Sequence, residues 1–142
     1  MIIQEFKPGN AYSYKELIAS PRKVNIEMNA SVTNQSLNFY LSVETYDSMD
    51  STCHMVVKFG KEIRWLEYPY TTCGRSNLLY WPLGSDLDLA CVCGITKIRF
   101  CENRSVVDVP INASAEKVRD AVSSMRNLQK DMYNKMMHAQ DF

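Results

Sequence analysis

The sequence predicts a mainly β domain of the α+β class, in which a small antiparallel barrel or sandwich of about seven strands precedes one long amphipathic helix. Two observations carry this prediction. Between residues 23 and 111, apolar and polar residues alternate in short segments separated by turn-forming residues, which is the period of half-buried strands. After Ser114 the apolar residues recur at steps of three and four, which is the period of a helix.

The 142 residues are expected to form a single domain (1–142), because this length suits one ordinary hydrophobic core. Residues 1–22 should hold an N-terminal strand and a short helix. The helix is indicated by residues 13–16 (Ser-Tyr-Lys-Glu), which match a capping box, and by Pro21, which would end it after Ile18.

The antiparallel sheet is predicted over residues 23–111, and its clearest part is a hairpin. Residues 24–32 alternate between apolar and polar side chains, residues 33–36 favour a turn, and the alternation resumes over residues 37–43. A second pair of strands is expected over residues 53–59 and 63–68, joined by a turn that begins at Gly60.

The later strands are shorter and are separated by proline and glycine. Residues 77–81 predict an aromatic strand that Pro82 stops. After Ser85 an inward row of another strand is expected, and a change of phase at Gly94 indicates a bulge or a sharp bend before Ile98 and Phe100. That row consists of Leu87, Leu89, Cys91 and Cys93. Residues 107–111 close the sheet, with Pro110 outward at an edge or strand end.

Residues 112–142 predict the C-terminal helix, which Asn112 or Ser114 can cap. Its apolar stripe consists of Val118, Ala121, Val122, Met125, Leu128, Met132 and Met136. At 1.5 Å per residue such a stripe is about 30 Å long, more than the opening of a small barrel needs. We therefore expect its methionine-rich outer part to contact another helix or an adaptable groove.

Charge and composition remove several classes of function. Sixteen basic side chains balance sixteen acidic ones, and Lys58, Lys61, Arg64 and Arg75 are interspersed with acidic and apolar residues, so there is no strong nucleic-acid signal. No membrane span and no signal-peptide pattern is recognisable. Five cysteines, an odd number, favour free thiols and a cytoplasmic or nuclear location.

Catalytic and metal-binding chemistry finds little support in the sequence. Cys91 and Cys93 are two ligands where structural zinc needs four, and Cys53 and His54 would point to opposite faces of one strand. Two aspartate pairs fall in or beside loops, where aspartate commonly bonds its own backbone: Asp47 with Asp50, and Asp86 with Asp88. We predict no catalytic residue, no metal site and no cofactor.

The most informative feature is the crowd of aromatic residues between positions 65 and 81, which exceeds what a single inward face readily absorbs. A strongly curved sheet that buries both faces would absorb it too. The function expected first is a non-catalytic protein–protein interaction module, a subunit or adaptor of a larger intracellular assembly, which binds a partner or a second copy of itself. The expected contact residues are Trp65, Tyr68, Tyr80, Trp81, Met125, Leu128, Met132 and Met136.

Two alternatives remain open from the sequence. Four Asn-x-Ser patterns, at Asn29, Asn34, Asn103 and Asn112, would suit a secreted or viral glycoprotein. A small-ligand-binding or enzyme domain would use the interior near Cys91. The order of elements resembles that of pleckstrin-homology-like domains, of proteasome-assembly-chaperone-like domains and of the head domains that precede a coiled coil in DNA end-joining scaffold proteins.

Overall fold

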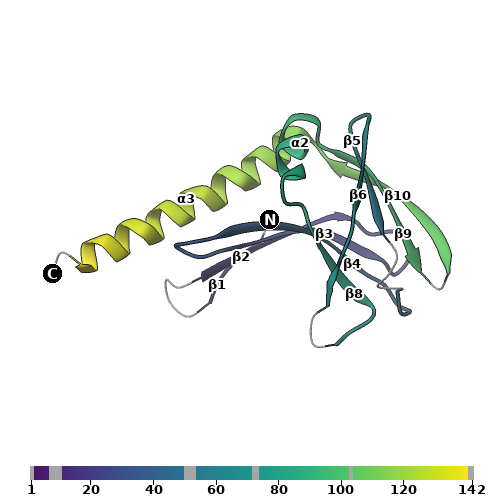
Figure 1. Cartoon of the computed structure of the whole chain (residues 1–142), viewed down its shortest axis with the longest axis horizontal. Helices are drawn as coiled ribbons and strands as arrows, with labels where there is room; N and C mark the ends of the chain where they lie inside the picture. Colours follow the sequence, from purple (N-terminus) through teal and green to yellow (C-terminus); the bar gives the residue numbers. More distant parts are fainter. Residues whose placement is uncertain (1, 7–10, 50–53, 72–73, 103, 141–142) are drawn as a thin grey trace.

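The computed structural model describes residues 2–6, 11–49, 54–71, 74–102 and 104–140. Within these ranges the chain is mainly β, with two antiparallel sheets and a long C-terminal helix, as the sequence predicts (Figure 1). Ten strands are present rather than about seven, and the described strands do not close into a barrel.

The larger sheet has six strands in the order β1-β2-β3-β4-β8-β7. They span Ile2–Phe6 (β1), Ala11–Ala19 (β2), Asn25–Val32 (β3), Leu37–Glu44 (β4), Tyr70–Thr71 (β7) and Leu78–Pro82 (β8). The predicted hairpin is confirmed as β3 and β4, which pair from Asn25 with Glu44 to Val32 with Leu37. Every second residue of a strand lies on the same face, and the inward row of this hairpin is buried except for the half-buried Leu37.

The smaller sheet has four strands in the order β10-β9-β5-β6. They span Met55–Phe59 (β5), Glu62–Leu66 (β6), Ile95–Glu102 (β9) and Ser105–Ala113 (β10). The turn predicted at Gly60 joins β5 to β6, and the edge position predicted for Pro110 is confirmed because β10 ends the sheet.

The short helix predicted before Pro21 is wrong, because residues 11–19 form the strand β2. This strand pairs with β1 on one side and with β3 on the other. Tyr14, inside the apparent capping box, turns inward and is almost completely enclosed. A capping box is a local signal worth about 1 kcal/mol, and two strand ladders together with a buried tyrosine outweigh it.

The strand predicted after Ser85 is also wrong, since Asp86–Cys93 forms the helix α2. Its most enclosed residue is Ala90, which lies outside the alternating row. Gly94 ends this helix with a φ of 70°, and its N–H donates to the carbonyl oxygen of Ala90 at 2.8 Å. The change of phase at Gly94 is therefore the end of a helix and not a bulge.

The C-terminal helix α3 spans Ala115–Gln140. Ser114 caps it, because its Oγ accepts a hydrogen bond from the backbone N–H of Lys117 at 3.1 Å. The helix lies along the inner side of the six-stranded sheet and reaches the β3–β4 turn (Figure 1). There Gln129 Nε2 donates to the Thr33 carbonyl at 3.1 Å, and Asn34 Nδ2 lies 2.9 Å from Met136 Sδ.

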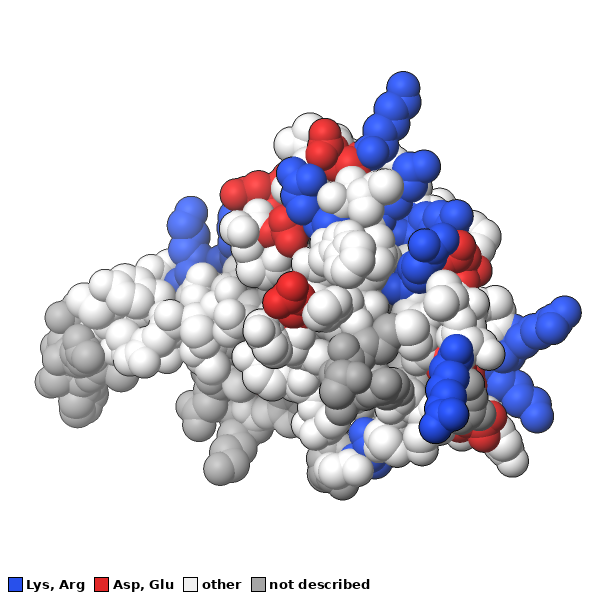
Figure 2. All heavy atoms as spheres, turned by 45° about the vertical axis from the view of Figure 1, so that its right-hand side comes forward, with Lys and Arg blue, Asp and Glu red and all other residues white. Residues whose placement is uncertain are grey.

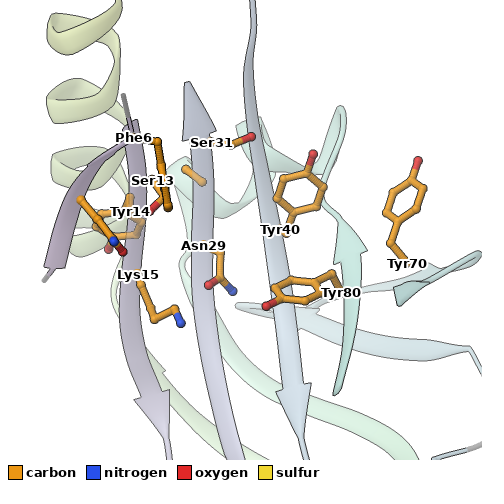
Figure 3. A pocket seen from close by; sticks show the side chains of 11 residues that line it. Phe6, Ser13, Tyr14, Lys15, Asn29, Ser31, Tyr40, Tyr70 and Tyr80 are labelled. Carbon is orange, nitrogen blue, oxygen red and sulfur yellow. The ribbon is translucent and has the colours of Figure 1, made fainter. Parts of the chain in front are cut away.

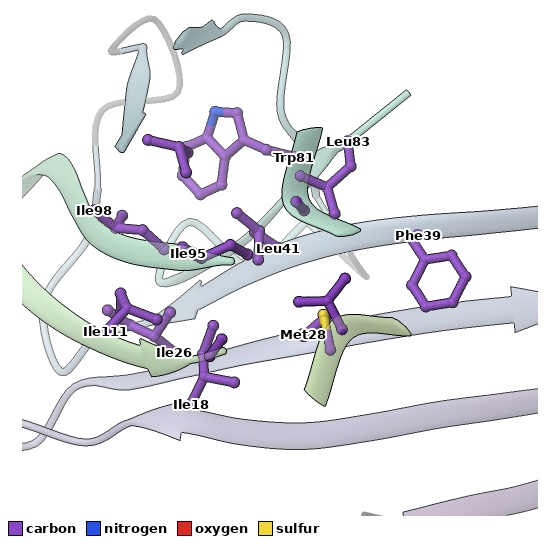
Figure 4. Packing of buried hydrophobic residues seen from close by; sticks show 14 of the residues in the cluster. Ile18, Ile26, Met28, Phe39, Leu41, Trp81, Leu83, Ile95, Ile98 and Ile111 are labelled. Atoms are coloured by element: carbon purple, nitrogen blue, oxygen red, sulfur yellow. The ribbon is translucent and has the colours of Figure 1, made fainter. Parts of the chain in front are cut away.

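One hydrophobic core joins both sheets and both helices. Figure 4 shows Trp81 and Leu41 from the larger sheet beside Ile98 from the smaller one. Trp81 is enclosed, and its indole Nε1 has no hydrogen-bond partner among the described atoms. The inner faces of the sheets are thus occupied by the core, so any partner has to meet the outer faces, the loops or the outer side of α3.

Candidate partner-binding faces

The structure separates the eight residues for which the sequence predicts partner binding. Trp81, Met125 and Met132 lie in the protein's own core, with exposed fractions of 1%, 0% and 6%. Leu128 and Met136 are half-buried on α3. The rings of Trp65 and Tyr68 are exposed and that of Tyr80 is half-exposed. A partner can therefore reach the five exposed or half-buried residues, but not the three that are buried in the core.

The neighbours Tyr80 and Trp81 show why the sequence could not make this separation. Adjacent residues of a strand face opposite sides, and the pairing of β8 with β4 decides which side is the core. Trp81 lies opposite Leu41 on the inner face, whereas Tyr80 lies opposite Ser42 on the outer face.

Trp65 belongs to the outer face of the four-stranded sheet. Strand pairing aligns one row of residues across this face, Trp65, Val56, Arg99 and Asp108, and a second row beside it, Ile63, Lys58, Lys97 and Pro110. Seven of these line a shallow hollow of about 310 Å³: Val56, Lys58, Ile63, Trp65, Lys97, Arg99 and Asp108. We call these seven residues the basic–aromatic face.

The apolar end of the basic–aromatic face lies on β6. The side chains of Trp65 and Ile63 are exposed to 64% and 57%. The ring of His54 lies beside the indole of Trp65, with 5.7 Å between the ring centroids. Large apolar side chains next to each other on a sheet face form a patch of the kind that marks contact sites.

The other end of this face is charged. Arg99 Nε and Nη2 bind Asp108 Oδ1 and Oδ2 at 2.6 Å and 2.9 Å, and Lys97 Nζ lies 3.6 Å from the same carboxylate. The hydrogen bond from Arg99 lowers the pKa of Asp108, and the same bond raises the pKa of Arg99. Lys58 has no ion-pair partner in the described part of the chain. In Figure 2, Lys and Arg side chains stand out from the half of the molecule away from the end of α3, with Asp and Glu side chains among them.

Tyr80 belongs to a different surface, on the outer face of the six-stranded sheet. Together with Tyr40 and Tyr70 it lines one side of an open hollow of about 400 Å³ (Figure 3). Lys15 and Asn29 line the other side, and Asn29 Nδ2 donates to Ser42 Oγ at 2.7 Å. The predicted contact residues include only Tyr80 of this tyrosine hollow. Tyr70 belongs to the aromatic crowd between positions 65 and 81, and the outward position of Tyr40 on its strand was a signal for the third ring.

The outer side of α3 adds Tyr133, which the prediction missed, beside Met137, which belongs to the predicted methionine-rich part of the helix. Tyr133 and Met137 are exposed, and they share one side of the helix because they are four residues apart. The predicted stripe, from Val118 to Met136, faces the core as far as Met132, with Leu128 and Met136 half-buried. The methionine-rich part of the helix is therefore largely covered by its own sheet, and the region around Tyr133 is what remains open.

Three of the five cysteines lie in the part of the chain that the structure describes. Cys91 and Cys93 lie on a helix and not, as predicted, side by side on a strand; both are free, and burial raises the pKa of the Cys91 thiol, which disfavours the thiolate. Cys101 is disulfide-bonded, which the expectation of free thiols did not include. Cys53 and Cys73 lie outside the described residues.

The structure places the second of the two predicted aspartate pairs on a helix. Asp86 and Asp88 lie in the first turn of α2, where acidic residues suit the helix dipole. Asp50 lies outside the described residues. No group of three or more histidine, cysteine, aspartate or glutamate side chains in the described ranges is placed to hold a metal ion. Of the four Asn-x-Ser sites, Asn29 is enclosed within the sheet.

Comparison with protein-family models, with curated proteins and with solved structures found no match to this chain. Among the helices that the structure describes, none combines the length and the apolar character needed to cross a membrane.

Proposed function

We propose that this chain is a non-catalytic protein–protein interaction domain, a subunit or adaptor of a larger assembly, which holds a partner on the basic–aromatic face. The observation that carries the proposal is the exposed pair of Trp65 and Ile63 on a strand of the sheet. Tryptophan is enriched among the residues that contribute most to binding, and an exposed indole beside a second large apolar side chain is a suitable anchor.

The support beneath the anchor suits this role. The core side of β5 is fully enclosed at Met55, Val57 and Phe59, and β5 pairs with β6 on one side and β9 on the other. β6, which carries Trp65, is an edge strand and pairs with β5 alone, so its support comes from β5 and the core beneath it. Backbone that is already ordered loses less conformational entropy when a partner binds.

Self-association through the C-terminal helix is the second part of the proposal. Met125 and Met132 are already used by the core, so a second copy would have to contact the outer side of α3 around Tyr133 and Met137. Exposed apolar residues at a four-residue spacing are the pattern by which one helix packs on another. Sedimentation of the Tyr133→Ser, Met137→Ser double variant should show a larger monomer fraction than the unaltered protein. An unchanged ratio of monomer to larger species would refute self-association through α3 and leave the partner-binding proposal standing.

The partner-binding part is tested by comparing protein captured from cell extract by the unaltered chain and by the Ile63→Ser, Trp65→Ser double variant. The matched control is Val92→Ser, because Val92 is an equally exposed apolar residue on α2, away from the face. We expect the double variant to lose the partner and the control to retain it, with both variants folded by circular dichroism. Identical capture by all three proteins would refute the proposal.

A further inference from the structure

We infer that the basic–aromatic face recognises an acidic segment of its partner, in which carboxylates lie one to three residues from a large apolar side chain. This inference rests on the proposed function and adds the chemistry of the partner. The observation behind it is the separation of apolar and cationic side chains along the two aligned rows.

The two rows have the same polarity across the sheet. Each row begins on β6 with a large apolar residue, Trp65 or Ile63. The first row has one cation, Arg99 on β9. The second row has cations on both strands, Lys58 on β5 and Lys97 on β9. An occupant that crosses the strands from β6 towards β10 therefore meets an apolar end first and a positive end second.

The spacing of the rows sets the spacing within the occupant. Neighbouring strands lie about 4.8 Å apart, so β6 and β9, two strands apart, are separated by about 10 Å. An extended peptide rises about 3.3 Å per residue. A carboxylate that reaches the β9 cations therefore lies about three residues from the apolar anchor in either direction, and one that reaches Lys58 lies about one or two residues from it.

The charges on this face are only partly neutralised from within, because one carboxylate is shared by two of its three cations. Asp108 is its one carboxylate, and it already pairs with both Arg99 and Lys97. Lys58 has no ion-pair partner among the described side chains, and His54 at the apolar end lies 4.0 Å from Glu67, outside the rows. Three cations against one carboxylate, in a chain of zero net charge, favour an acidic occupant.

A nucleic acid is the competing occupant for a face with cations and a tryptophan. Single-stranded nucleic acids are bound by several aromatic rings on which successive bases stack, together with a groove of cations that follows the phosphates. Among its seven residues this face has one aromatic ring, and beside it are the branched aliphatic side chains of Val56 and Ile63. These suit an aliphatic or aromatic side chain of a peptide better than a row of bases.

The test is a selection of displayed random peptides of about twelve residues on the unaltered protein, followed by binding measurements on the enriched peptides. We expect the enriched peptides to combine a large apolar residue with aspartate or glutamate one to three positions away. Their affinity should fall about tenfold or more in the Lys58→Glu, Lys97→Glu double variant and with rising salt. It should be retained in the control Arg126→Glu, Lys130→Glu, which reverses two exposed charges on α3.

The other outcomes distinguish a failure of this inference from a failure of the proposed function. Enriched peptides that need Trp65 but carry no acidic residues, or that ignore the charge reversal, would overturn this inference and leave the proposed function standing. Failure to enrich any peptide that needs Trp65 would count against the face itself, and hence against both. Binding of single-stranded oligothymidylate that the Lys58→Glu, Lys97→Glu variant abolishes, without acidic peptides, would assign the face to nucleic acid and also overturn the inference.

Discussion

Replacing Gly94 with alanine should destabilise the protein more than any other glycine-to-alanine change whose surroundings the structure describes. Gly94 follows α2 and has φ 70° and ψ −175°, a backbone conformation that is essentially confined to glycine. A Cβ atom there would lie 2.6 Å from the Ala113 carbonyl oxygen and 2.8 Å from the Ala115 nitrogen. Both are backbone atoms, at the junction where β10 passes into α3, so neither can move without shifting an element.

The magnitude follows from two contributions. Backbone strain of this kind costs about 1–3 kcal/mol, and overpacking against atoms that cannot yield costs about another 1–3 kcal/mol. We therefore expect the free energy of unfolding to fall by about 2–6 kcal/mol, against typical totals of about 5–15 kcal/mol. With a urea slope of about 2 kcal/mol per molar, the unfolding midpoint should fall by about 1–3 M.

The matched control is Gly84→Ala, because Gly84 has a positive φ of 54° but a Cβ atom added there would meet no other atom within 4 Å. Only conformational strain acts at this site, so a cost of about 1–2 kcal/mol is expected. Urea unfolding followed by circular dichroism measures both variants. Equal midpoint shifts for the two would show that the close approach of Gly94 to the β10–α3 junction is not the cause, and would refute the reasoning.

Two further predictions concern the core. Met125→Ala should lower the free energy of unfolding by about 2–5 kcal/mol, because Met125 is fully enclosed on the core side of α3. Met137→Ala, on the outer side of the same helix, should change it by less than about 0.5 kcal/mol. Similar losses for the two variants in urea unfolding would contradict the packing of this side of the helix on the core. Burial, followed by the hydrogen bond to Glu16, raises the pKa of Tyr14 above its ordinary value near 10. The unfolded chain then releases this proton above about pH 10 while the folded protein keeps it, so stability should fall as the pH rises from there. Tyr14→Phe should reduce that fall and the exposed-site control Tyr46→Phe should not; equal alkaline slopes would exclude Tyr14 as its source.

The alternation of apolar and polar residues was enough to locate the hairpin of β3 and β4, the strand β5 and the buried stripe of α3. It succeeds there because a side chain's face follows from its position in the repeat, whatever the partner element is. The same reasoning failed for residues 13–18 and 86–93. A local capping pattern and an alternating row of leucine and cysteine each suit two conformations, and pairing or packing with distant residues chose between them.

The candidate site divides in the same way. The sequence alone determined that this chain has a sheet, a long amphipathic helix and more aromatic side chains near residue 65 than one inner face requires, because these properties are set by residues close together in the chain. It also presented Lys58 as an ordinary solvated charge. Only the tertiary structure placed Lys58 beside Lys97 and Arg99, because the pairing of β5 with β9 joins segments about forty residues apart and no local pattern records which strands will meet.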